Sequence, residues 1–213
     1  MRDNALPSIP WQVTGNHWVA LPCVHPVDGS VHALGVLHRG ARAAVEFAGS
    51  ADFQSGQGAA LARPVFRVDG TPLELARGGI AWERAFHWLP TFTAQADGLI
   101  VRGTIFAPFG LDADIAGVVY ALAVENRGSV SRQVSLSFEG VLGHRQVRVR
   151  SARPVEDASR VTAAEGGVVV LDGSGAPGLA ALAIGSDEAG TVAVHDGAEP
   201  GYVLERQFTV EPG

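Results

Sequence analysis

Two neighbouring apolar runs, joined by a short polar turn, constrain the fold of this chain more than any other feature. Residues 118–124 are nearly all apolar, which is typical of a strand that is buried on both faces. After the turn at 125–128, apolar and polar residues alternate over 133–138, as expected for a strand with one buried and one wet face. The pair predicts adjacent β-strands, and nothing in it resembles a catalytic motif.

Asp-Gly dipeptides beside strand-like runs predict hairpins. They occur at Asp28-Gly29, Asp69-Gly70, Asp97-Gly98, Asp172-Gly173 and Asp196-Gly197. Asp-Gly suits a two-residue type I′ turn, because both central residues of that turn need positive φ. The clearest hairpin spans 66–75. Within it, Pro72 has no N–H to donate to a ladder, which indicates an edge strand or a slightly longer loop.

Further strands are expected at short intervals along the whole chain. They cover 17–24, 31–38, 43–47, 80–88 and 99–106, and later 145–150, 167–171, 179–184, 191–195 and 202–210. Residues 151–167 are interpreted as a loop or irregular edge, and no useful stretch has the helical period. We therefore predict an all-β fold, a large antiparallel two-layer β-sandwich with little helix, forming a single domain over residues 1–213.

Charge and composition exclude several classes of partner. The formal net charge of −6 argues against nucleic acid or an anionic membrane as a ligand. The N-terminus lacks the apolar core of a secretory signal, and the longest apolar run is too short to span a bilayer. We expect a cytoplasmic protein. Its single cysteine, Cys23, lies in an apolar run and is expected to be a buried, inert thiol.

Motifs for metal or nucleophilic chemistry are missing. The seven histidines form no HxH or HExxH pair, and Asp112 and Asp114 supply too few ligands for a calcium loop. We expect no metal, no cofactor and no catalytic residue. The alternative is a mutarotase- or epimerase-like enzyme, with His87 or His144 as acid; Glu139 or Glu205 would then serve as base.

The best functional candidates lie in the aromatic segment 81–90. Trp82, Phe86 and Trp88 share one strand parity, while Arg84 and His87 lie close by in the sequence. Aromatic faces stack on sugar rings, and Arg84 or His87 could hydrogen-bond sugar hydroxyls. Tryptophans on one strand face also anchor cores and domain interfaces, the interpretation we favour. The candidates for carbohydrate binding or a domain interface are Trp82, Arg84, His87 and Trp88.

A family resemblance rests on residues 88–140 and on the final strand, 208–213. These segments resemble the N-terminal β-supersandwich (galactose-mutarotase-like) domain of bacterial glycoside hydrolases and phosphorylases that carry an (α/α)6 barrel. The features that carry it are Glu125, Asn126 and Gly128 in the turn, and Gly140 at the end of the following strand.

The resemblance implies a non-catalytic domain. Such a domain packs in cis against a helical (α/α)6 catalytic barrel and shapes its active-site entrance, with the acid and base carboxylates supplied by the barrel. It further implies an exposed apolar patch that includes some of Trp11, Trp18, Trp82 and Trp88. A stand-alone carbohydrate-binding module is another alternative, so carbohydrate remains a possible partner. The sequence leaves the oligomeric state open.

Overall fold

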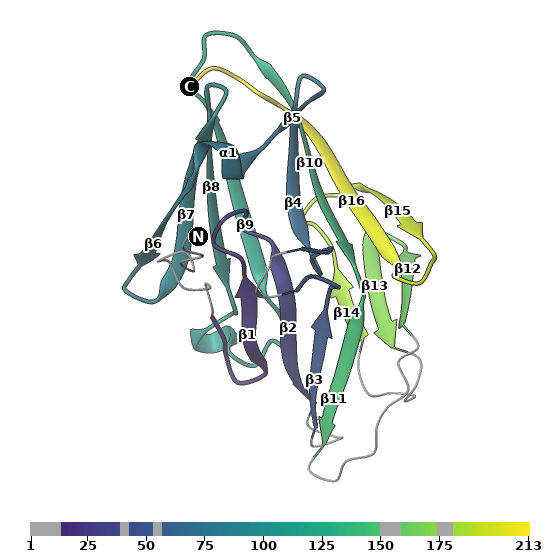
Figure 1. The fold of residues 1–213 in the computed structure, drawn as a ribbon. Coiled ribbons are helices and arrows are strands. Elements are labelled where there is room, and N and C mark those ends of the chain that lie inside the picture. Colours follow the sequence, from purple (N-terminus) through teal and green to yellow (C-terminus); the bar gives the residue numbers. More distant parts are fainter. Residues whose placement is uncertain (1–13, 39–42, 53–56, 150–158, 174–180) are drawn as a thin grey trace, which may run out of the picture.

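Almost all regular structure in this protein is β-strand (Figure 1). The computed structural model describes residues 14–38, 43–52, 57–149, 159–173 and 181–213. Within them the only helical elements are α1 (Leu75–Gly78) and the short 3-10 turn η1 (Gly110–Asp112). The predicted all-β, antiparallel sandwich is confirmed. Trp11 and residues 150–158, 179 and 180, for which we made predictions, lie outside the described part.

The strands form four antiparallel sheets. The first has the order β1-β2-β3-β11, with β1 (Val19–Val24), β2 (Val31–His38), β3 (Ala43–Ala48) and β11 (His144–Val149). The second has the order β15-β16-β10-β4-β5, with β15 (Thr191–His195), β16 (Gly201–Val210), β10 (Arg132–Val141), β4 (Arg63–Val68) and β5 (Thr71–Leu73). The third is β6-β7-β8-β9, with β6 (Ile80–Ala85), β7 (Leu89–Ala96), β8 (Leu99–Phe106) and β9 (Val119–Asn126). The fourth is β12-β13-β14, with β12 (Ser159–Ala164), β13 (Val168–Gly173) and β14 (Ala181–Ile184).

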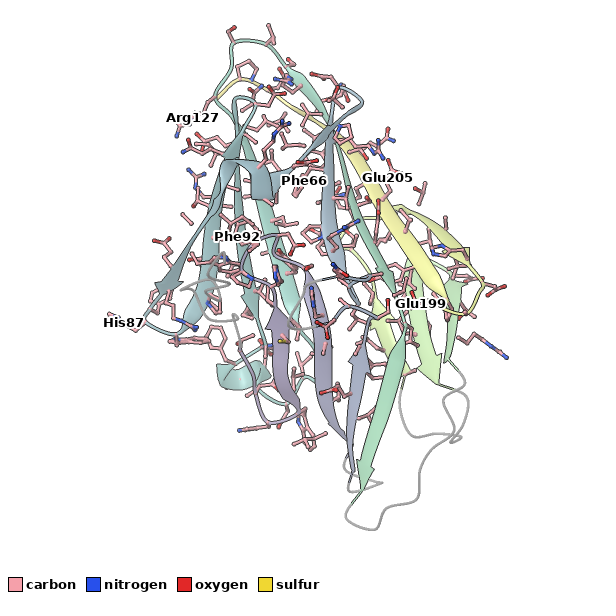
Figure 2. The ribbon with its side chains drawn as sticks, in the orientation of Figure 1. Phe66, His87, Phe92, Arg127, Glu199 and Glu205 are labelled. Atoms are coloured by element: carbon pink, nitrogen blue, oxygen red, sulfur yellow. The ribbon has the colours of Figure 1, made fainter. Side chains whose placement is uncertain are left out.

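Two large apolar clusters hold the sheets together. One joins the first, second and fourth sheets and contains Phe47, Tyr202 and Leu171. The other joins the second and third sheets through residues such as Phe66 and Phe92, which lie between them (Figure 2). These residues alternate with more exposed ones along their strands, as a sheet with one covered face requires.

Most predicted hairpins are confirmed, with one exception. Asp69-Gly70 and Asp97-Gly98 form two-residue turns with positive φ at both positions. Pro72 lies in β5, at the edge of its sheet as predicted. Asp28-Gly29 and Asp196-Gly197 lie in longer loops between paired strands. The hairpin prediction at Asp172-Gly173 is wrong, because both residues continue the ladder of β13 with β12.

Several strand boundaries differ from the prediction, and the strand β7 was not predicted. The expected strand at 80–88 ends at Ala85, because Phe86 and His87 both adopt positive φ and reverse the chain into β7. Part of the segment interpreted as loop or irregular edge, Ser159–Ala164, is the edge strand β12. It pairs with β13 over its whole length, and its Val161 is buried in the larger core cluster, so pairing and burial stabilise a strand that the sequence pattern marks only weakly.

The predicted burial of 118–124 on both faces is wrong for the described structure. Tyr120, Leu122 and Val124 point inward and are half-buried, but Val119, Ala121 and Ala123 on the other face are exposed. The reason is that the protein's core covers only the inner face of this sheet, and none of the described elements covers the outer face of β9.

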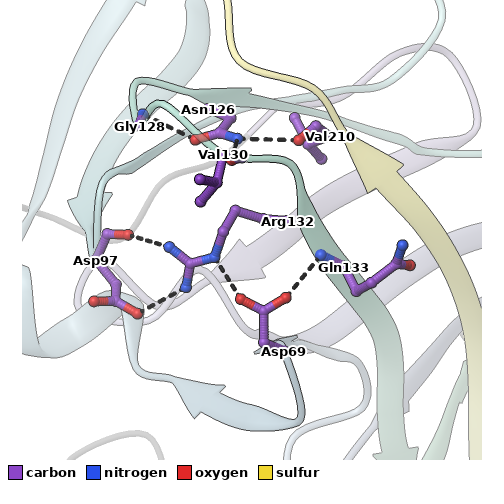
Figure 3. Close-up of polar contacts among 8 residues, drawn as sticks. All are labelled: Asp69, Asp97, Asn126, Gly128, Val130, Arg132, Gln133 and Val210. Atoms are coloured by element: carbon purple, nitrogen blue, oxygen red, sulfur yellow. Dashed lines mark hydrogen bonds and ion pairs between the residues drawn. The ribbon is translucent and has the colours of Figure 1, made fainter.

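Two of the residues on which the family resemblance rests, Asn126 and Gly140, have clear structural roles. The buried Asn126 side chain donates from Nδ2 to Val130 O (2.7 Å) and to Val210 O (3.0 Å), and its Oδ1 accepts from Gly128 N (2.9 Å) (Figure 3). It therefore ties the turn to the end of β16. At Gly140, an added Cβ would lie 1.9 Å from Leu61 O, so only glycine fits.

A polar network beside Asn126 joins three strand ends. Arg132 donates from Nε to Asp69 Oδ2 (2.5 Å) and from Nη2 to Asp97 Oδ2 (3.2 Å) (Figure 3). Asp69 Oδ1 accepts from Gln133 N at 2.9 Å. This backbone bond and Arg132 hold the pKa of the Asp69 carboxyl below its usual value. The two Asp-Gly turns are thus fixed to the start of β10.

Candidate functional site

The turn between β6 and β7 is the most unusual surface feature. Phe86 has φ 51° and His87 has φ 70°, a left-handed conformation that bulky residues rarely adopt. Trp88 N donates to Ala85 O at 3.2 Å, which closes the turn, and Arg84 Nη1 donates to Trp88 O at 3.2 Å. Phe86 is nevertheless 80% exposed, so its ring gains little burial in return for this backbone strain.

An apolar surface adjoins this turn. The ladders of the third sheet place Ala85, Leu89, Phe106 and Val119 in one row across its outer face. Trp88 and Phe109 lie beside the row, with ring centroids 4.8 Å apart and edge-to-face, and Phe106 lies 6.2 Å from Phe109. We call these six residues the outer apolar patch: Ala85, Leu89, Trp88, Phe106, Phe109 and Val119.

The outer apolar patch occupies only one end of its sheet. Further along the same face, the rows contain threonines and then the ion pair of Arg102 Nη1 with Glu125 Oε2 at 2.7 Å. Trp88, Phe109 and Val119 are each more than 40% exposed. A local apolar end on an otherwise polar face is a feature typical of an interaction surface.

The structure brings together three of the four predicted site residues. His87 and Trp88 lie on the strained turn, and Figure 2 shows His87 at its outer tip. Arg84 lies in β6 and is joined to the turn by its bond to Trp88 O. Trp82 is separated from Trp88, because the turn ends the parity of the strand. Its Nε1 donates to Pro26 O at 2.6 Å, and its ring packs 5.1 Å from Phe92.

Sequence analysis missed the other members of the outer apolar patch. Phe106 and Val119 were assigned only to strands, and Phe109 lies in the loop after β8. The available signal was the absence of polar residues at alternate positions of 118–124. That pattern indicated a covered outer face, and the face is exposed.

A buried polar cluster on the β1–β2 loop superficially resembles a catalytic triad. Ser30 Oγ donates to Asp28 Oδ1 at 2.6 Å, and His32 Nε2 lies 3.0 Å from Ser30 Oγ. Ser30 is 1% exposed, so no substrate can reach its hydroxyl. The carboxylate also contacts the serine rather than orienting the histidine, contrary to the triad arrangement. The cluster is a structural turn.

The carboxylates of the alternative enzyme lie far from the strained turn. Glu139 and Glu205 occupy the solvent face of the second sheet, where Ser137 and Ser135 donate to them at 3.0 and 2.7 Å. The bonds from Ser135 and Gln207 hold the pKa of Glu205 below its usual value, which makes this carboxylate a weaker base. Figure 2 places Glu205 and His87 on opposite sides of the molecule. Of His144 the structure describes only the backbone, in β11.

The Cys23 thiol and the possible metal ligands form no reactive site among the described residues. Burial, with a smaller effect of Glu46, raises the pKa of the Cys23 thiol to about 11, so it stays protonated near neutral pH. Among the described residues, no three His, Cys, Asp or Glu side chains are grouped so as to hold a metal ion. No helix in the same residues has the length and apolar character needed to cross a bilayer.

Comparison with known protein families and with curated proteins finds no match for this chain.

Proposed function

We propose that this chain is a non-catalytic β-sandwich module of a cytoplasmic carbohydrate-active enzyme. In this proposal it packs in cis against a helical (α/α)6 catalytic domain and shapes the entrance of that domain's active site. The outer apolar patch is the contact surface. The observation that carries the proposal is an uncovered apolar sheet end beside a strained, exposed aromatic turn.

The chemistry of the outer apolar patch supports a protein partner. Its row is apolar from Ala85 to Val119, and Ala121 continues the apolar surface along β9. Helices cover sheets through such faces, because both elements must bury an apolar side. Trp88 and Phe109 flank the row as large aromatic rings, the residue type that most often anchors interfaces.

The strained turn gives independent support. Holding a bulky residue at positive φ costs on the order of 1–3 kcal/mol. Asn and Gly adopt positive φ at little cost, and Asp-Gly occupies the positive-φ positions of the turns at 69–70 and 97–98 in this chain. Keeping Phe86 and His87 there is reasonable if their side chains make contacts in the assembled enzyme.

Footprinting tests the proposal. The chain is produced alone and joined to the helical domain encoded in its reading frame, and hydroxyl-radical oxidation of aromatic side chains is compared. We expect oxidation of Trp88 and Phe109 to fall several-fold in the joined protein, while oxidation of inward-facing Trp82 stays unchanged. Phe106→Asp should restore oxidation of Trp88. Gln95→Asp, at the polar end of the same face, should leave the protection intact.

Two results would overturn the proposal. One is a reading frame that encodes no helical domain with paired carboxylates. The other is equal oxidation of Trp88 in the isolated and joined proteins.

A stand-alone carbohydrate-binding module is the second candidate, because Trp88 is exposed and its backbone carbonyl accepts a hydrogen bond from the Arg84 guanidinium. Aromatic stacking and a guanidinium donor are the groups that bind sugar rings. Titration calorimetry of the isolated chain with soluble glucans and galactans separates the two. Heat of binding that disappears in a folded Trp88→Ala variant would favour this candidate, and no heat with any glycan would exclude it for those sugars.

A further inference from the structure

Over residues 119–124, the edge of β9 that faces away from β8 pairs with no other described strand and has none of the features that normally prevent strands from pairing between molecules. Residues 119–124 include no charge and no proline. The ladder with β8 runs without a bulge from Leu99↔Asn126 to Phe106↔Val119. Proteins usually protect such edges with lysine, proline, bulges or very short strands. An unprotected edge over the six residues 119–124, about 20 Å long at the usual rise, therefore needs an explanation.

The hydrogen-bond pattern shows which backbone groups face this edge. Arg127 N donates to Gly98 O at 2.9 Å, so Gly98 and Arg127 form a hydrogen-bonded pair. Such pairs alternate along an antiparallel ladder. It follows that Tyr120, Leu122 and Val124 direct their N–H and C=O groups away from β8. At the next such position, Asn126 O accepts from Gly213 N at 3.1 Å, so this edge already pairs with a backbone segment at one end.

A groove of about 1430 Å³ lies along the inner side of β9. Its lining includes Tyr120 and Leu122 of β9, Leu136 and Phe138 of β10, and Leu182 and Ile184 of β14. β14 is also an edge strand of its sheet. A purely apolar ligand could fill such a groove but could not satisfy the backbone groups of β9. An extended strand with apolar side chains at alternate positions does both.

β9 itself is a strand of that kind, and its two ends carry opposite charge. Asp112 and Asp114 precede it, and Asp114 also lines the groove. At the other end Glu125 is bound by both Arg102 and Arg127, at 2.7 and 2.6 Å, so two cations face one carboxylate. An antiparallel pair of β9 strands places the acidic end of each beside the basic end of the other.

We propose that two copies of this chain associate through β9, which pairs antiparallel with β9 of the second copy about a two-fold axis. The pairing merges the two third sheets into one continuous sheet. Each β9 then lies along the groove of the other copy, so the contact is self-complementary, as two-fold symmetry requires. It uses the edge of β9 and is independent of the proposed function.

Sedimentation velocity of the full chain over a range of micromolar concentrations tests the pairing. We expect a reversible monomer–dimer equilibrium. Leu122→Pro removes an N–H from the free edge without removing a bond to β8, and it should weaken dimerisation by about tenfold or more. Leu122→Ala is the matched control, because it loses the same side chain but keeps the N–H. It should dimerise more tightly than the proline variant.

Charge exchange tests the orientation. Asp114→Arg alone and Arg127→Asp alone should each weaken the dimer by about threefold to tenfold. The double variant should recover most of that loss, because opposite charges again meet. Circular dichroism confirms that each variant is folded. A chain that stays monomeric at all concentrations would overturn the proposal, as would a dimer that Leu122→Pro leaves unchanged.

Discussion

His32 is the residue whose charge state the fold controls most clearly. Its ring is buried and stacks on His25, with centroids 5.3 Å apart and planes 8° apart. Burial lowers the pKa of His32 below its ordinary value, and the neighbouring His25 lowers it further, while Asp28 opposes the shift. The fold therefore favours the neutral imidazole.

This shift predicts a loss of stability in mild acid. Below about pH 6.5 the unfolded chain binds a proton at His32 that the folded chain does not, so the free energy of unfolding falls as pH decreases through that range. Urea unfolding at pH 8 and pH 5.5 should show the loss, and His32→Asn should reduce the difference between the two values. His195→Asn, at an exposed position, is the control and should keep the wild-type difference. Equal pH dependence in wild type and His32→Asn would contradict this account.

At the scale of secondary-structure elements, the β6–β7 turn makes the sharpest prediction. Replacing Phe86 with Asn and His87 with Gly supplies residues that adopt positive φ without strain. We expect the double variant to increase the free energy of unfolding by about 1 kcal/mol or more. Denaturant unfolding measures this directly. A decrease in stability would mean that the Phe86 ring contributes more to the isolated chain than its exposure suggests.

Short sequence signals, namely two Asp-Gly dipeptides and one proline, correctly predicted two turns and one edge strand. Asp69-Gly70 and Asp97-Gly98 form the expected turns because the conformational preference lies in the dipeptide itself, and Pro72 occupies an edge because it lacks an N–H. The strained turn was missed because nothing in the Phe86-His87 dipeptide favours positive φ.

Tertiary arrangement explains the remaining differences. In residues 118–124 both strand faces are apolar, so the sequence cannot show which face the protein's own core will cover. The structure leaves the outer face exposed. Likewise, strand parity predicts that Trp82 and Trp88 share one face. The turn at Phe86 and His87 ends the strand between them, so in the structure they are separated. Arg84, His87 and Trp88 were candidates from the sequence, whereas Phe106 and Phe109 were recognised as neighbours of Trp88 only in the folded chain, through the β8–β9 ladder and the ring contacts.

At the scale of the described molecule, apolar surface forms two local features, whereas the reactive groups considered above lie apart from one another. The outer apolar patch lies at one end of the third sheet, and the groove lies between β9 and β14. By contrast, His87, Glu139 and Glu205 belong to two different sheets, and the Ser30 hydroxyl is buried. This distribution is consistent with a domain that works through contacts with other protein surfaces.

A catalytic assay of the purified chain tests this account most directly. Hydrolysis and phosphorolysis of aryl glycosides, and the mutarotation of α-glucose and α-galactose followed by polarimetry, are measured with and without the protein. We predict rates equal to those of buffer alone in every case. A rate above buffer that disappears on Glu205→Gln or Glu139→Gln, in a variant that stays folded, would contradict a non-catalytic role.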